Sequence, residues 1–428
     1  MFDLTMIVVG AVIGSGIFLT PSMIVRHLMD VRLVYGIWIL GGMMAVAGAL
    51  TFAELANVFP RVGGIYAYLT EAYHPYVGFA YGWCMLLVMN SGSLAALCAA
   101  CVNYVSYFFP MTPWTQKFAA AGVMFFLTAM NIAGVRQGSV VSNIFSMVKI
   151  LGIAALVLGA LCIPHAPVIN PVSAMPENLG MALSMAMVGV LWSYGGWQYA
   201  TFPAGEVRSP SRSIPRSIVL GVAVIIVLYL GANMAYLSVL PMALMASDPH
   251  VASLAAEKLA GPSGGAAIAV LIALSTFGTA SVHTLAAPRI YYAMAADGVF
   301  FPSIAELHPK RRTPVRALCM QLAVVVVLIF SGTFDELIAY VAFVDWIFYA
   351  LAAGAVFVFR RTHASAERRY RTAGYPVTPA LFILVSLAFV GYLFSNETLK
   401  SGIGLAILLS SAPVYVLWRK KLSRQPVA

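Results

Sequence analysis

Charged residues are scarce in this sequence. Only 9% of its 428 residues are Asp, Glu, Lys or Arg, whereas 61% are hydrophobic and the mean hydropathy is +0.90. A soluble domain keeps roughly a quarter of its residues charged, so this composition excludes soluble enzymes and nucleic-acid-binding proteins. A chain this apolar requires a lipid bilayer around most of its surface.

Catalytic and metal-binding motifs are also lacking. The sequence contains no H-E-x-x-H, no G-x-S-x-G and no phosphate-binding loop, so we expect neither an enzyme nor a resident cofactor or metal ion. Cysteines are few and lack the paired spacing of a metal site, so we interpret them as small buried hydrophobic residues. The five cysteines are Cys84, Cys98, Cys101, Cys162 and Cys319.

Long apolar runs are abundant. A membrane-spanning helix needs about 20 residues, and twelve runs approach or exceed that length. The predicted spans are residues 4–26, 33–57, 76–107, 117–133, 141–162, 181–203, 216–240, 265–294, 315–331, 337–359, 378–396 and 402–418. The first run has no basic N-terminal stretch and no small-residue cleavage site, so we do not interpret it as a signal peptide. The sequence therefore predicts an all-α membrane protein of twelve helices.

The positive charges predict the orientation of these helices. Nineteen of the 25 Lys and Arg residues fall in segments on the same side as the two termini, five fall on the other side, and Lys149 lies within a span. Cytoplasmic segments are enriched in Lys and Arg. We therefore expect a multi-pass protein of the cell membrane with both termini in the cytoplasm, and we interpret the net charge of +10 as topology rather than as a nucleic-acid footprint.

Closely spaced glycines interrupt two of the predicted spans. Gly14-Ser15-Gly16 interrupts the first span and Gly195-Gly196 interrupts the sixth, and a proline follows each break at Pro21 and Pro203. Paired interrupted helices in equivalent positions of two inverted halves indicate a transporter site near the middle of the membrane. The alternative is that these glycines only allow close helix packing.

The spacing of the breaks predicts an internal repeat. Each interrupted span is the first of a group of five spans. Because five is an odd number of membrane crossings, the second group has the opposite orientation in the membrane to the first. We expect one membrane domain made of a first repeat at residues 1–163, a second at 181–360, and two further helices at 377–420. Unwound backbone in a membrane needs partners for its N–H and C=O groups. A zwitterion supplies them, because its carboxylate suits the start of a half-helix and its ammonium suits the end of another.

Four long segments resemble one family. They are GAVIGSGIFLTP at 10–21, FAELANVFPRVGGIYAYLTEAY at 52–73, WSYGGWQYATFPAGEVRSPSRSIPRSI at 192–218 and PRIYYAMAADGVFFPSIAELHPKRRTPVRAL at 288–318. Together they resemble the amino acid, polyamine and organocation (APC) transporter superfamily, and within it the L-amino-acid transporter branch. The resemblance implies a LeuT-type fold with a five-plus-five inverted repeat. Relatives usually carry a polar lead before the first span, so we also expect a start upstream of Met1.

The resemblance also implies a substrate site. It assigns a carboxylate cradle on the first break, carbonyl groups for the amino end on the sixth span, and further site-facing side chains on the sixth and seventh spans. In that order, these residues are Ile13, Gly14, Ser15 and Gly16; Trp192, Ser193 and Gly195; and Gln198, Tyr229 and Asn233. Trp192 would also close over the substrate, the alternative being a core or lipid-facing tryptophan. Gln198 stands where relatives often carry Asn, so the substrate preference of relatives does not transfer.

Lys149 lies about 12 Å inside the fifth span, counted at 1.5 Å per residue. A charge at that depth is a functional hypothesis by default, although a snorkelling or structural lysine is the alternative. The resemblance places its ammonium where sodium-coupled relatives hold a cation, so we expect sodium-independent transport. Hydroxyl partners on the eighth span would be Thr276, Thr279 or Ser281. The sequence leaves open whether Lys149 stays a fixed charge or releases a proton.

Two more ionisable residues lie within predicted spans, His283 in the eighth and Asp345 in the tenth. Either could be a proton site or a specificity site, because His titrates near neutral pH and a carboxyl within the membrane needs a partner. The alternative for both is a satisfied contact between helices.

These features predict a secondary transporter of neutral L-amino acids that works by alternating access, as an exchanger or a proton-coupled symporter. The alternatives are a transporter of cationic amino acids or polyamines, and an amino-acid-sensing membrane receptor. Animal light chains of the branch join a glycoprotein subunit through a cysteine in the external segment that corresponds to residues 107–117, which here contains none. We therefore expect no disulfide-linked heavy subunit, and a monomer or weak dimer whose partners are the amino acid substrate and the bilayer.

Overall fold

The computed structural model describes residues 1–164, 168, 170, 176–207, 209–331 and 334–422, and within them the regular structure is entirely helical. The first half contains α1 (Phe2–Val12), α2 (Gly16–His27), α3 (Val31–Val58), α4 (Ile65–Ala72), α5 (Pro75–Cys84), the π-helix η1 (Met85–Met89), α6 (Asn90–Val105), α7 (Pro113–Ala133) and α8 (Val135–Cys162). The second half begins with α9 (Leu179–Tyr194), the short 3₁₀ helices η2 (Trp197–Thr201) and η3 (Ala204–Glu206), α10 (Pro210–Val239), α11 (Met242–Ser247) and α12 (Val251–Ala260). It ends with α13 (Pro262–Ala286), α14 (Pro288–Ala296), η4 (Pro302–Ala305), α15 (Val315–Ser331), α16 (Phe334–Thr362), α17 (Val377–Asn396) and α18 (Thr398–Leu422).

Eleven helical stretches among the described residues are long and apolar enough to cross a membrane. They coincide with eleven of the twelve predicted spans. The remaining prediction, residues 315–331, corresponds to α15, an apolar helix of 17 residues. Seventeen residues rise about 26 Å, which is the lower limit for a spanning helix. The protein is therefore a multi-pass, all-helical membrane protein.

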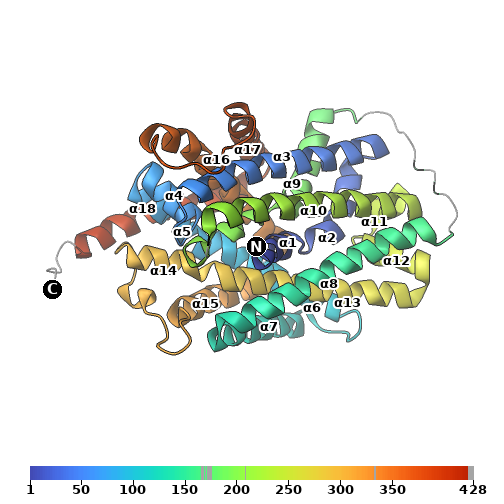
Figure 1. The fold of residues 1–428 in the computed structure, drawn as a ribbon. Helices are drawn as coiled ribbons and strands as arrows, with labels where there is room; N and C mark the ends of the chain where they lie inside the picture. The colour runs from blue at the N-terminus through green and yellow to red at the C-terminus, as the bar shows by residue number, and fades with distance from the viewer. Residues whose placement is uncertain (165–167, 169, 171–175, 208, 332–333, 423–428) are drawn as a thin grey trace.

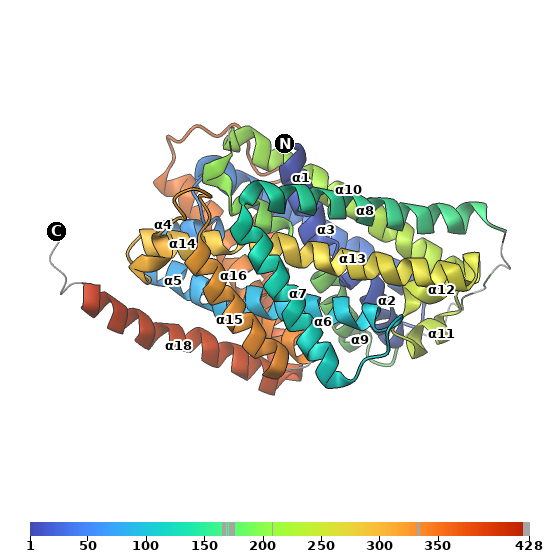
Figure 2. The same ribbon diagram turned by 90° about the horizontal axis from the view of Figure 1, so that it is seen from below.

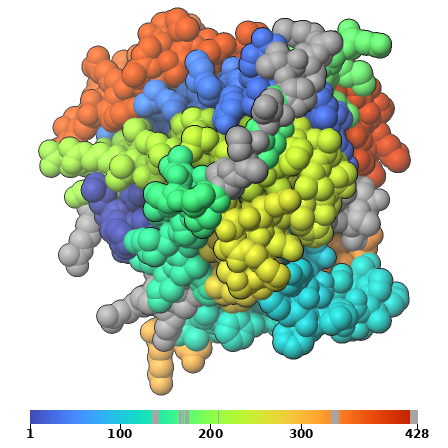
Figure 3. All heavy atoms as spheres, turned by 90° about the vertical axis from the view of Figure 1, so that its right-hand side faces the viewer, coloured from blue at the N-terminus to red at the C-terminus, as the bar shows by residue number. Residues whose placement is uncertain are grey.

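The first two helices lie in the centre of the bundle. Figures 1 and 2 show α1 and α2 surrounded by longer helices, among which α3, α8, α10 and α13 run side by side. Both faces of α1 are buried against α8, α10 and α13. In contrast, α17 and α18 lie at the periphery and bury little of their surface. Figure 3 looks onto one end of the bundle, where α11 and α12 cover the middle of the face.

The cysteines correct one expectation. Cys84, Cys98 and Cys101 are buried as predicted, but Cys162 and Cys319 are exposed on the outside of the bundle. An apolar residue of a spanning helix can face lipid as readily as protein, so an apolar neighbourhood does not establish burial.

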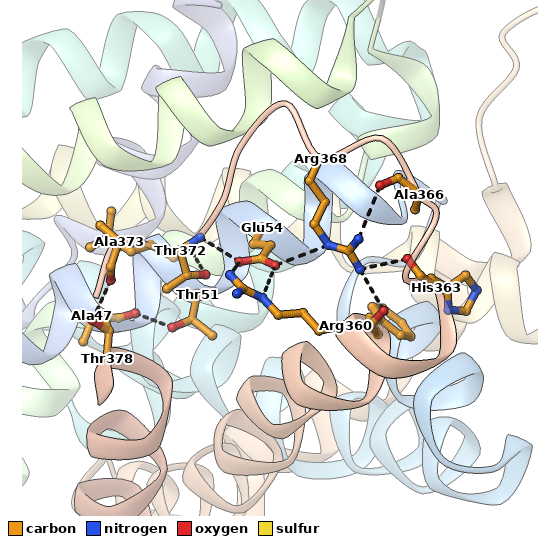
Figure 4. A network of polar contacts seen from close by, with 12 residues as sticks. Ala47, Thr51, Glu54, Arg360, His363, Ala366, Arg368, Thr372, Ala373 and Thr378 are labelled. Atoms are coloured by element: carbon orange, nitrogen blue, oxygen red, sulfur yellow. Dashed lines mark hydrogen bonds and ion pairs between the residues drawn. The ribbon is translucent and has the colours of Figure 1, made fainter. Parts of the chain in front are cut away.

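An ion network around the buried carboxylate of Glu54 joins three segments of the chain (Figure 4). Glu54 of α3 accepts two hydrogen bonds of 2.8 Å from Arg360 of α16, and a further one of 2.7 Å from the backbone N–H of Thr372. Arg368 lies 3.7 Å from the same carboxylate and donates to the carbonyl groups of Phe359 and His363 at 2.8 and 2.9 Å. The network ties α3 and α16 to the connection before α17.

Candidate functional site

The first helix breaks between α1 and α2. Helix α1 ends at Val12 and α2 begins at Gly16, where the glycine pattern predicts the interruption. In the described part of the chain, no hydrogen bond is donated by the backbone N–H groups of Ser15, Gly16 and Ile17. Three free N–H groups at a helix start, together with the helix dipole, form a binding site for an anion such as a carboxylate.

The carbonyl groups freed by the same break are satisfied by side chains. The hydroxyl of Tyr229 lies 3.1 Å from the Val12 carbonyl oxygen. The Ile13 oxygen accepts from Thr279 at 2.9 Å and from Ser275 at 3.2 Å. The break therefore leaves its N–H groups free and its carbonyl groups occupied, which makes it selective for negative charge.

The second break follows α9. This helix ends at Tyr194, and Gly196 has a φ of +116°, a conformation that side chains rarely adopt. A Cβ at Gly196 would also lie 2.8 Å from the Ala11 carbonyl oxygen, so this glycine lets the two breaks approach. The Gly195 N–H donates to the Trp192 carbonyl at 3.2 Å, and no donor among the described residues bonds to the Gly195 carbonyl that follows the helix. The negative end of α9 can therefore accept hydrogen bonds from a cation.

A cavity lies between the two breaks. It provides about 60 Å³ of space for water centres, which is room for roughly four to six waters at about 10–15 Å³ each. Its walls come from the two breaks and from α6, α13 and α16. The predicted residues that line it are Gly14, Ser15, Gly16, Trp192, Gly195, Gln198, Thr279, His283 and Asp345. The cavity thus joins the start of α2 to the end of α9.

Other predicted residues support the breaks from behind. Ile13, Ser193, Tyr229 and Asn233 do not line the cavity. The Tyr229 hydroxyl also lies 3.0 Å from the Ser193 carbonyl oxygen, so it contacts both breaks. Asn233 donates to the carbonyl of Tyr229 on its own helix at 2.8 Å. Tyr229 therefore holds the interrupted backbone of both breaks, whereas Asn233 bonds only within α10.

Lys149 is fully buried between α1 and α13. Its ammonium group donates to the Gly10 carbonyl at 2.9 Å and to the Thr279 hydroxyl at 2.6 Å. Of the three predicted hydroxyl partners, only Thr279 makes this contact. Thr276 donates to carbonyls of its own helix, and the Ser281 hydroxyl has no partner within the described residues. Lys149 therefore links the fifth predicted span to the first break through Thr279.

His283 and Asp345 both line the cavity from different helices, α13 and α16. The His283 ring stacks on Tyr199, with centroids 4.1 Å apart and planes 15° apart, and neither ring nitrogen has a hydrogen-bond partner in the described residues. The Asp345 carboxyl makes no hydrogen bond or ion pair with any described residue. Asp345 is therefore not the satisfied polar contact between helices that was the alternative.

The sequence did not single out three aromatic residues that line the cavity, Tyr199, Trp346 and Tyr349. The Tyr349 hydroxyl accepts a hydrogen bond of 2.5 Å from the side-chain amide of Gln198. The side-chain oxygen of the same amide accepts from the Gly196 N–H at 3.1 Å. A signal for Tyr349 was present, because it follows Asp345 by four residues and so lies on the same helical face, and Trp346 directly follows Asp345. Asp345 in a predicted span therefore pointed to its neighbours on α16.

Comparisons with known proteins identify the family of this chain. The family model of the amino acid permeases matches residues 1–416. The serine/threonine exchanger SteT of Bacillus subtilis is 29% identical over 424 residues, which cover 98% of this chain and 96% of that protein. The mouse b(0,+)-type amino acid transporter 1 is 30% identical, with 90% and 80% covered, and the mouse large neutral amino acids transporter small subunit 2 is 29% identical, with 97% and 80% covered. The chain therefore belongs to the amino acid permease family of the APC superfamily, whose members are membrane transporters of amino acids.

Proposed function

We propose that this protein moves neutral L-amino acids across the cell membrane by alternating access around the two helix breaks. One observation carries the proposal: the unbonded N–H groups at the start of α2 and the unbonded Gly195 carbonyl after α9 border the same cavity. Opposite helix ends match the carboxylate and the ammonium of a zwitterion. The cradle is Gly14, Ser15 and Gly16, and Trp192 borders the opposite side as a gate.

The proposal includes the architecture that the sequence predicts. Twelve spans would form inverted repeats at 1–163 and 181–360, followed by the two helices of 377–420, with both termini in the cytoplasm. The interruption of the first helix of each proposed repeat supports this arrangement. Alternating access would then consist of one group of helices rocking around the site between the breaks.

Sodium independence is part of the proposal. Lys149 donates to the Gly10 carbonyl and to Thr279, and so its ammonium occupies a position between α1 and α13 where a bound cation would need oxygen ligands. A lysine ammonium supplies the positive charge there without a metal ion. A small cavity and relatives named for serine/threonine and for large neutral amino acids support a neutral substrate.

A cationic amino acid or a polyamine is the second candidate, and Asp345 is the observation that favours it. Its carboxyl borders the cavity without a partner among the described residues. No feature of the described residues favours an amino-acid-sensing receptor over a transporter.

Purified protein in proteoliposomes tests the proposed function. Labelled amino acids with neutral, cationic and acidic side chains are offered with and without sodium, and with and without internal amino acid. We expect sodium-independent uptake of small neutral amino acids, and no uptake by a Gly16→Val variant in the same vesicles. Lack of uptake of every amino acid would contradict the transporter proposal, and an absolute requirement for sodium would contradict the role of Lys149.

A further inference from the structure

Asp345 places a carboxyl group in the wall of the cavity. It lies on one face of α16 with Ala342, Trp346 and Tyr349, and all four line the space between the breaks. Among the described residues no donor bonds to this carboxyl. A carboxyl group within the span of a membrane is costly unless a positive charge, a proton or a donor compensates it.

The basic residues of the surrounding helices do not supply that compensation. Lys149 does not line the cavity, and its ammonium is bonded to Gly10 and Thr279. Arg289 forms a two-pronged ion pair with Glu206, with distances of 2.6 and 2.8 Å. Both basic side chains are therefore committed to other partners.

His283 does not neutralise Asp345 either. It makes no ion pair with Asp345, and the buried ammonium of Lys149 opposes a second positive charge on the His283 ring. The remaining titratable side chains in electrostatic reach of the carboxyl are Tyr81 and Cys84 of α5, Tyr199 of η2 and Tyr349. None of these can carry a positive charge, so the cavity has one acidic group in excess.

In the proposed function, a zwitterion balances the two helix breaks. The start of α2 takes its carboxylate and the end of α9 takes its ammonium, which leaves Asp345 without a counter-charge. Resting on the proposed function, we propose that Asp345 binds one additional positive charge that enters the cavity with each transported amino acid. Trp192, Trp346 and Tyr349 border the same cavity, and aromatic rings stabilise a nearby organic cation.

The positive charge has two possible sources with the same chemistry at the carboxyl. It is either the ammonium or guanidinium of a basic substrate side chain, or a proton that accompanies a neutral amino acid. In the second case the carboxylate oxygen of Asp345 forms an O–H bond with a proton from the aqueous side, and the proton leaves on the other side after the substrate. Both sources make the loaded cavity neutral.

Calorimetric titration of the purified, detergent-solubilised protein distinguishes the sources. Lysine and serine are the probes, each in two buffers with different ionisation enthalpies, at neutral and at mildly alkaline pH. The buffer dependence of the heat gives the number of protons taken up with each bound amino acid. We expect either lysine binding without proton uptake, or serine binding with uptake of one proton at the alkaline pH.

Substitutions of Asp345 test whether this residue binds the additional positive charge. Asp345→Asn should abolish whichever behaviour the wild type shows, so that lysine binding falls at least tenfold or serine binds without a proton. Asp345→Glu should restore it in part. Glu257→Gln, which removes an exposed carboxyl of α12, should behave as the wild type. Size-exclusion elution and thermal unfolding establish that each variant is folded.

Two results would overturn the proposal. One is a wild type that binds serine without taking up a proton at either pH and does not bind lysine. The other is an Asp345→Asn variant, folded by both criteria, that keeps the charge-linked behaviour of the wild type. A wild type that binds no amino acid with any kind of side chain would contradict the proposed function instead, so the two failures differ.

Discussion

The ammonium group of Lys149 donates a hydrogen bond of 2.6 Å to the hydroxyl of Thr279. Because that hydroxyl also lies 2.9 Å from the carbonyl oxygen of Ile13, the two side chains connect α8 and α13 to the break after α1. If α8 moves relative to α1, these hydrogen bonds must break or the bonded groups must move together.

Replacing Lys149 should impair transport without unfolding the protein. Lys149→Ala leaves the buried Gly10 carbonyl without its donor, at a cost of about 1–3 kcal/mol. We expect a tenfold or larger fall in initial uptake rate or apparent affinity in proteoliposomes, with the elution volume of the wild type. Thr276→Val, which removes a hydroxyl that donates to carbonyls of its own helix and not to Lys149 or the first break, is the control. Wild-type kinetics of Lys149→Ala would exclude the residue from the mechanism.

Gly14 and Gly16 should respond differently to alanine. A Cβ at Gly16 would lie 2.7 Å from the Ser193 Cα, whereas a Cβ at Gly14 would meet Leu97 and Thr279 at ordinary distances of 3.4 and 3.5 Å. Gly16→Ala should lower the melting temperature and abolish uptake. Gly14→Ala should keep its stability yet weaken uptake, because its methyl group enters the cavity. Normal uptake by valine variants at both positions would contradict the carboxylate cradle.

The hydroxyl of Tyr229 should matter more than that of its neighbour on the same helix. Tyr229 contacts the Val12 and Ser193 carbonyls at 3.1 and 3.0 Å, whereas Tyr236 makes one long contact of 3.4 Å with Ile17. We expect Tyr229→Phe to weaken substrate binding roughly tenfold, since buried carbonyls lose their donor, and Tyr236→Phe to bind within about twofold of wild type. Titration calorimetry measures both. Equal affinities in the two variants would speak against a bridging role for Tyr229.

The network around Glu54 should be a source of stability. Glu54→Ala removes the carboxylate that pairs with Arg360 and lies beside Arg368. Removing one partner of a buried ion pair costs about 3–5 kcal/mol, so the melting temperature followed by tryptophan fluorescence should fall clearly. Glu71→Ala is the matched control, because Glu71 is partly exposed and lies 3.5 Å from His363. If Glu54→Ala melted at the same temperature as Glu71→Ala, the network would not contribute to stability.

The positions of the helix breaks could be predicted because glycine acts locally. Gly14-Ser15-Gly16 and Gly195-Gly196 interrupt their helices through backbone freedom that the residues carry with them. The proximity of Lys149 to α13 was also expected, because the family resemblance implies that its ammonium lies between the first break and the eighth span. Which of Thr276, Thr279 and Ser281 it would meet depended on the rotation of α13, which hydroxyl spacing does not determine.

The lining contributed by α16 could not be predicted in full for a related reason. Trp346 and Tyr349 are apolar enough to face lipid, protein or cavity, and an aromatic residue in a span is ordinary in all three places. Their position became evident only when packing brought α16 next to the second break, where Tyr349 bonds Gln198. The exposure of Cys162 and Cys319 has the same origin.

By itself the sequence determined that this protein lives in a membrane, where its spans begin and end to within a few residues, and where two of them are interrupted. Those properties follow from apolar length and from glycine, which act within a single segment. Only the tertiary structure decided which face of each helix meets the cavity. Lipid and protein interior are similarly apolar, so the pattern along a spanning helix does not separate its inner face from its outer face.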